Sequence, residues 1–143
     1  FIQDDFNLLY LKPIFSDFEN NYKLMARSPL ASGLLSGKIS KRTVFQKDDH
    51  RSGWIKGERL ASLLKRIQCL EKLSDLPLPT LARRFLLNYS SIDSVIFGVK
   101  NETHVDDIFQ DLSSSKLDHN IIDQLFDLHS NDFGLINEKH LGY

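Results

Sequence analysis

Hydroxyls, glycines and cations concentrate in one stretch, residues 27–38, with the sequence RSPLASGLLSGK. It begins where a predicted buried strand, residues 23–27, ends. Parallel α/β proteins bind ligands at the carboxyl ends of strands, and closely spaced backbone N–H groups beside a lysine favour an anion. The stretch is not a P-loop, which would need Gly at Ser32 and Ser or Thr at Ile39, and it contains no G-x-G-x-x-G. Both a phosphate-binding loop and a turn with a solvated lysine fit this spacing.

A second candidate lies at residues 98–101, where Gly98 and Lys100 stand between a predicted strand and a predicted helix. His104 and Asp107 fall on the first turns of that helix. A helix N-terminus with a nearby lysine attracts an anion, although taken alone the segment is better described as a helix start with a solvated lysine. Two such sites at the ends of neighbouring parallel strands would suit a dinucleotide with separated phosphates.

The other ionisable residues indicate less chemistry. Residues 48–51 (DDHR) form a charged cluster in a long polar loop, and we expect it to be solvated, with contact between Arg51 and a phosphate as the alternative. Cys69 has no basic neighbour in sequence and is predicted to pack rather than react. No metal site is predicted, because the histidines lack H-x-x-x-H or H-E-x-x-H spacing; they are His50, His104, His119, His129 and His140.

Strands and helices alternate along the chain, which favours an α/β fold with parallel strands. A short strand is predicted at the start of the chain, residues 1–3, with polar residues after it. The other predicted elements are a crossover at 14–22, strands at 23–27 and 94–97, a loop at 37–53, helices at 56–73, 80–88, 103–112 and from Asp118, and a tail at 133–143. Pro77 and Pro79 are expected to stop the first of these helices, and Thr80 to open the second.

Composition excludes several classes of protein. The net charge of -1 gives no strongly basic field for nucleic acid, and no apolar run is long enough for a membrane span. One cysteine excludes an internal disulfide and fits a reducing compartment, so a cytoplasmic location is predicted. A closed (β/α)8 barrel needs roughly 200 residues or more, which exceeds the 143 residues of this chain.

These motifs resemble the C-terminal portion of an aldo-keto reductase from Phe1 to about Leu128. Residues 28–38 resemble the family's pyrophosphate-binding loop after the seventh strand, and this match is the most specific one. Gln3 with Asn7 resembles the sixth strand, residues 48–51 a loop motif of one bacterial-type branch, and residues 96–107 the segment after the eighth strand. The resemblance implies that residues 1–143 are the C-terminal, cofactor-binding part of a (β/α)8 TIM barrel, incomplete, with three parallel strands and surrounding helices.

The resemblance also implies NADP as the cofactor. Gln3 would contact the nicotinamide amide, Arg27 would stack on the nicotinamide face, and Lys100 would favour the extra phosphate of NADP. The cofactor-binding residues implied are Gln3, Arg27, Ser28, Pro29, Leu30, Ser32, Lys38, Arg51, Gly98, Lys100, His104 and Asp107. Three positions depart from the family's usual residues: Phe97 replaces Pro, His104 replaces Gln, and Ile108 replaces an Asn that hydrogen-bonds adenine.

The family's catalytic Asp, Tyr, Lys and His lie on earlier strands, so no catalytic residue is predicted here. The chain starts at Phe1 and its only methionine is Met25, so we expect a processed product or a piece of a longer protein. By resemblance it would be the NADP-binding part of a reductase of aldehydes and ketones, and it would need the missing N-terminal half or self-association. A non-catalytic binding or assembly module and a poorly folding fragment are the alternatives.

Overall fold

Three parallel strands form a single sheet in a computed structural model that describes residues 2–11 and 22–135. The strands are β1 (Ile2–Asp5), β2 (Leu24–Arg27) and β3 (Ser94–Val95), in the spatial order β1-β2-β3. Residue Ile2 of β1 pairs with Leu24, and Met25 of β2 pairs with Ser94. The predicted α/β class with three parallel strands is therefore confirmed.

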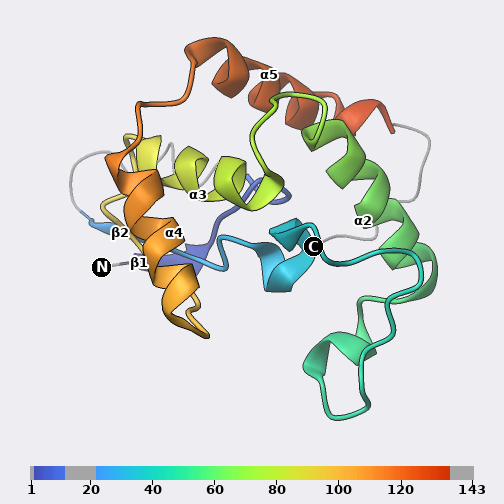
Figure 1. Cartoon of the computed structure of the whole chain (residues 1–143). Helices are drawn as coiled ribbons and strands as arrows, with labels where there is room; N and C mark the ends of the chain where they lie inside the picture. Colours follow the sequence, from blue (N-terminus) through green and yellow to red (C-terminus); the bar gives the residue numbers. More distant parts are fainter. Residues whose placement is uncertain (1, 12–21, 136–143) are drawn as a thin grey trace.

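Four α-helices are described. They are α2 (Gly57–Leu70), α3 (Leu78–Asn88), α4 (Glu102–Ser113) and α5 (His119–Ser130), and three 3-10 turns accompany them: η1 (Ala31–Ser36), η2 (His50–Gly53) and η3 (Asp132–Gly134). Figure 1 shows α3 between the strands and α5, with α2 and α4 at opposite sides of the molecule. The 3-10 turns η1 and η2 lie in the connection between β2 and α2. Because η2 falls within residues 37–53, part of the predicted loop forms a regular turn.

The core lies on one face of the sheet. Leu24 and Ala26 of β2 are buried, whereas Met25 is half-buried and Arg27 is exposed, as the alternation of side chains along a strand requires. On the buried face, Phe6 stacks on Phe85 of α3 with ring centroids 6.0 Å apart. The opposite face carries Arg27 and the exposed Gln3 side chain, and within the described residues no helix buries it.

Several element boundaries differ from the sequence prediction. Strand β1 extends to Asp5 rather than ending at residue 3; none of its residues is fully buried, and the buried run follows it at residues 6–9. Helix α3 begins at Leu78 rather than Thr80, with Pro79 in its first turn. Proline suits that position because its fixed φ is helical and its missing N–H has no partner there. Helix α2 ends at Leu70, three residues before the predicted end.

Helix α4 exposes apolar side chains and buries a charged one. Its apolar residues Val105, Phe109 and Leu112 are 37%, 64% and 55% exposed. Asp111 is instead the buried residue of this helix, and its carboxylate accepts a hydrogen bond from Arg83 Nε of α3. The predicted crossover at 14–22 and the tail after residue 135 lie, apart from Tyr22, outside the described residues.

Candidate functional site

The loop after β2 has an unusual backbone. Three residues other than glycine have positive φ: Ser28 at 56°, Ala31 at 49° and Ser32 at 55°. Such left-handed conformations cost of order 1 kcal/mol each and persist only when the surroundings impose them. Ala31, Leu34 and Leu35 are buried beneath the loop and anchor it. Residues held in sparsely populated conformations cluster at ligand sites, which marks this loop as a candidate site.

A carboxylate on β1 joins this loop to the sheet. Asp5 pairs with Arg27 in the parallel register, and its Oδ1 lies 3.0 Å from Arg27 Nε. The same oxygen accepts a hydrogen bond of 2.7 Å from Ser28 Oγ. Asp5 therefore contacts both the last residue of β2 and the first residue of the loop.

A depression of about 520 Å³ opens at the carboxyl ends of β1 and β2. It brings together three predicted cofactor-binding residues, Arg27, Ser28 and Ser32. Its other lining residues were not predicted as cofactor-binding; they are Asp4, Asp5, Tyr10, His50, Trp54 and Arg59. The Arg59 guanidinium carbon lies 5.0 Å from the centre of the Trp54 ring, so the indole and a second cation form one wall.

Arg51 fastens the polar loop to the residues after β2. Its Nη2 lies 2.6 Å from Asp49 Oδ2, and its Nη1 donates to the Ser32 carbonyl oxygen at 3.3 Å. The guanidinium carbon also lies 4.4 Å from the centre of the Phe45 ring. The hydrogen bond from Arg51 holds the pKa of the Asp49 carboxyl far below its usual range.

The prediction that residues 48–51 are solvated is therefore wrong for half of the cluster. Asp48 and His50 are exposed, but Asp49 and Arg51 are half-buried and paired with each other. A bidentate ion pair two residues apart is favoured here because the Asp49 side chain also accepts from Arg51 N and caps η2. Arg51 contacts the loop through the Ser32 carbonyl, which places it beside the candidate site without lining the depression.

The second predicted site follows β3. Because β2 and β3 pair in parallel, residues 28 and 98 follow neighbouring strand ends, as predicted. Gly98 and Lys100 are exposed, whereas His104 and Asp107 are half-buried. The N-cap of α4 is Asn101, whose Oδ1 accepts from His104 N at 3.1 Å.

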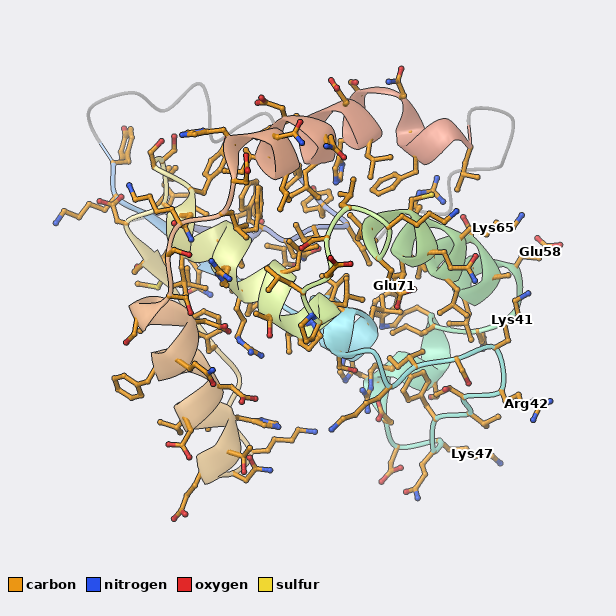
Figure 2. All side chains as sticks on the ribbon, turned by 45° about the horizontal axis from the view of Figure 1, so that its top comes forward. Lys41, Arg42, Lys47, Glu58, Lys65 and Glu71 are labelled. Carbon is orange, nitrogen blue, oxygen red and sulfur yellow. The ribbon has the colours of Figure 1, made fainter. Side chains whose placement is uncertain are left out.

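The remaining predicted residues lie outside the depression. Gln3 and Lys38 are exposed, Leu30 is half-buried and Pro29 is buried. Lysines and an arginine of the following loop project outward at the edge of the molecule, as Figure 2 shows for Lys41, Arg42 and Lys47. The structure thus brings Arg27, Ser28 and Ser32 together at the depression, whereas Gln3, Lys38 and the residues after β3 do not line it.

The described residues offer neither a cluster for a metal ion nor a helix that could span a membrane. Within residues 2–11 and 22–135, no three His, Cys, Asp or Glu side chains lie where they could hold a metal ion. None of the helices in this same part of the chain has the length and apolar character needed to cross a membrane.

Comparison with known proteins gives a family match and a structural match. The model of the aldo/keto reductase family matches residues 10–128. A solved structure of a glycerol dehydrogenase from Gluconobacter oxydans superposes with a TM-score of 0.76 at 22% sequence identity. The superposition covers 99% of this chain and 45% of that one, so the chain spans less than half the length of that structure. No curated protein sequence matches the chain.

Proposed function

Because the chain belongs to the aldo/keto reductase family, we propose that it binds NADP(H) and is the cofactor-binding part of an NADPH-dependent reductase of aldehydes or ketones. The observation that carries this proposal is the left-handed loop at residues 28–33 beside Arg27 and the depression. The residues present fit such a cofactor: Arg27 offers a planar cation, Ser28 and Ser32 offer backbone N–H groups at a strand end, and Ser32 also offers a hydroxyl.

The chain's own residues would bind and orient the cofactor. When bound, the nicotinamide supplies the hydride for reduction of a carbonyl. The Arg27 guanidinium would stack on the nicotinamide face, and Gln3, exposed on the same face of the sheet, would hydrogen-bond its carboxamide. Ser28, Ser32 and Lys38 would surround the pyrophosphate. Arg51 supports this arrangement because it holds the Ser32 carbonyl.

The adenosine end would lie after β3. Gly98 permits close approach of the backbone, and Lys100 precedes the N-terminus of α4. A lysine there would favour the additional phosphate of NADP over NAD, while His104 and Asp107 of α4 would flank the ribose and adenine. In this proposal the two anion sites belong to one dinucleotide.

Reduction itself is proposed only for a protein that places the family's catalytic tetrad beside this part. The chain corresponds to 45% of the length of the glycerol dehydrogenase structure, and the tetrad has no counterpart by motif among its 143 residues. We therefore expect the 143 residues alone to bind the cofactor without reducing a carbonyl. The carbonyl substrate and a cytoplasmic location belong to the same proposal.

The test is a fluorescence titration of the purified chain with NADPH and NADH. Trp54 is the only tryptophan and lines the depression, so quenching of its emission reports occupancy of this site. We expect saturable quenching that is stronger for NADPH. The variant Lys100→Ala should lose roughly tenfold in NADPH affinity, the value of one charge-assisted phosphate contact.

Lys116→Ala is the matched control, because Lys116 is also exposed but lies beyond the far end of α4. It should bind NADPH like the unmodified chain. Absence of saturable binding of either dinucleotide would contradict the proposed function, and equal losses in both variants would contradict the role of Lys100.

A second candidate function, a non-catalytic assembly module, is favoured by α4 and the sheet edges. Val105, Phe109 and Leu112 form an exposed apolar stripe at helical spacing, and β1 and β3 are both edge strands. Sedimentation equilibrium tests this function: Phe109→Ser should dissociate a self-assembled form. Val44→Ser, which changes an apolar residue that is 90% exposed on the polar loop, should leave it intact. A concentration-independent monomer would exclude self-assembly.

A further inference from the structure

We propose that Asp5 is a positioning residue of the cofactor site, which fixes the Arg27 guanidinium so that its plane can meet the nicotinamide. The inference rests on the proposed NADP-binding function and deepens it. Asp5 contacts Arg27 and Ser28 and acts on the cofactor through these two neighbours.

The register of the sheet places Asp5 for this role. Asp5 and Arg27 are paired residues of two parallel strands, so their side chains emerge on the same, uncovered face. Asp5 Oδ1 lies 3.0 Å from Arg27 Nε, and Arg27 Nη2 donates to Asp5 Oδ2 at 3.5 Å. A carboxylate facing the Nε–Nη2 edge restricts rotation of the guanidinium plane. The half-exposed side chain can then present a planar face of the guanidinium to a ligand in the depression.

The exposure of the pair argues against a purely structural role. The Arg27 side chain is 50% exposed and that of Asp5 is 30% exposed. Ion pairs this accessible contribute little to the stability of a fold, because water and salt screen them and ordering two side chains costs entropy. The main consequence of the Asp5 carboxylate is therefore the orientation of the Arg27 guanidinium, and its contribution to the stability of the fold is smaller.

Asp5 also acts on the first residue of the loop. Ser28 has φ of 56°, and its hydroxyl hydrogen is used in the 2.7 Å bond to Asp5 Oδ1. A hydroxyl has one hydrogen and two lone pairs, so Ser28 offers a ligand an acceptor oxygen rather than a donor. The Asp5 carboxylate thus orients the Arg27 guanidinium and also determines that the Ser28 hydroxyl accepts, rather than donates, a hydrogen bond from a ligand.

The experiment compares two ligands on the full chain. NADPH carries the nicotinamide, whereas 2′-phospho-ADP-ribose has the same phosphates without the nicotinamide. Asp5→Ala should weaken NADPH binding roughly tenfold and change binding of the nicotinamide-free ligand less than about twofold. Asp5→Asn, which keeps the shape of the side chain, should show part of the same selective loss and guards against misfolding of the alanine variant.

Two controls separate positioning from general damage. Asp123→Asn removes a carboxylate from the exposed surface of α5 and should affect neither ligand. In a double-mutant cycle, Asp5→Ala should cost little further NADPH affinity in an Arg27→Gln background, because its effect on nicotinamide binding passes through Arg27. Full additivity in this cycle, equal losses for both ligands, or unchanged NADPH affinity would overturn the role of Asp5.

Failure of the underlying function gives a different result. If the unmodified chain binds neither ligand, NADP binding itself fails and the role of Asp5 falls with it. If the unmodified chain binds both ligands and the Asp5 variants bind NADPH equally well, only the positioning role is lost.

Discussion

The ion pair between Arg83 of α3 and Asp111 of α4 should be a sensitive point of the fold. Both side chains are almost fully buried, 10% and 5% exposed, and Arg83 Nε donates to Asp111 Oδ2. Replacing Asp111 by Ala leaves an uncompensated guanidinium in the interior, which costs about 3 to 5 kcal/mol. Native proteins have about 0.05 to 0.15 kcal/mol of stability per residue, or roughly 7 to 20 kcal/mol for a chain of this size. One substitution would therefore remove a large share of the total.

Urea unfolding followed by far-UV circular dichroism measures this loss. With a slope of about 2 kcal/mol per molar urea, Asp111→Ala should lower the midpoint by roughly 2 M at unchanged slope. The double variant Arg83→Met with Asp111→Leu removes both charges and should recover most of the loss, since apolar residues of similar volume often replace buried ion pairs without cost. A loss below about 1 kcal/mol in Asp111→Ala, or a double variant as unstable as the single one, would refute the reasoning.

Two further predictions concern a histidine and the polar loop. Burial lowers the pKa of His129, whose Nε2 lies 2.8 Å from the Leu8 carbonyl oxygen. As the pH drops, the unfolded chain therefore binds a proton at this histidine before the folded chain does. The free energy of unfolding should fall as the pH drops below about 6.5 and should level off below the lowered pKa. His129→Phe should flatten this pH dependence, measured by urea titrations at several pH values. Arg51→Ala removes the hydrogen bond to the Ser32 carbonyl, so amide hydrogen exchange at residues 31–37 should accelerate, whereas Asp48→Asn should leave it unchanged.

Local patterns predicted the strands and most helices because their signals are contiguous. The apolar run ending at Arg27 and the three- and four-residue spacing of leucines in α2 each specify an element without help from the rest of the chain. The start of α3 was predicted at the wrong residue because proline occurs both after the end of a helix and in the first turn of one. Only the path of the chain before Leu78 shows that Pro79 lies in the first turn of α3. The exposed stripe of α4 has the periodicity of a buried face, so periodicity alone could not show that it is uncovered.

The candidate site likewise contains some residues that local patterns predicted and others that they did not. Arg27, Ser28 and Ser32 were predicted because they share one segment at a strand end. Trp54 and Arg59 line the depression only because the polar loop returns to the sheet, and no local pattern signals that return. Asp5 lies between these cases, because strand alternation puts it on the face of Gln3, but only the register shows that it opposes Arg27.

Assembly need not block the depression, because the depression and the exposed apolar stripe lie on different elements of the chain. The depression is lined by residues of β1, Tyr10, the segment 27–32, η2, Trp54 and α2, and none of its lining residues belongs to α4. The exposed apolar stripe lies on α4, which Figure 1 places at the edge of the molecule. A polypeptide that covered Phe109 and paired with β3 would extend the sheet beyond its third strand without occupying the carboxyl end of β1. The anchoring of α4 by Asp111 then affects both roles, because the same helix carries the apolar stripe and the proposed contacts to adenosine.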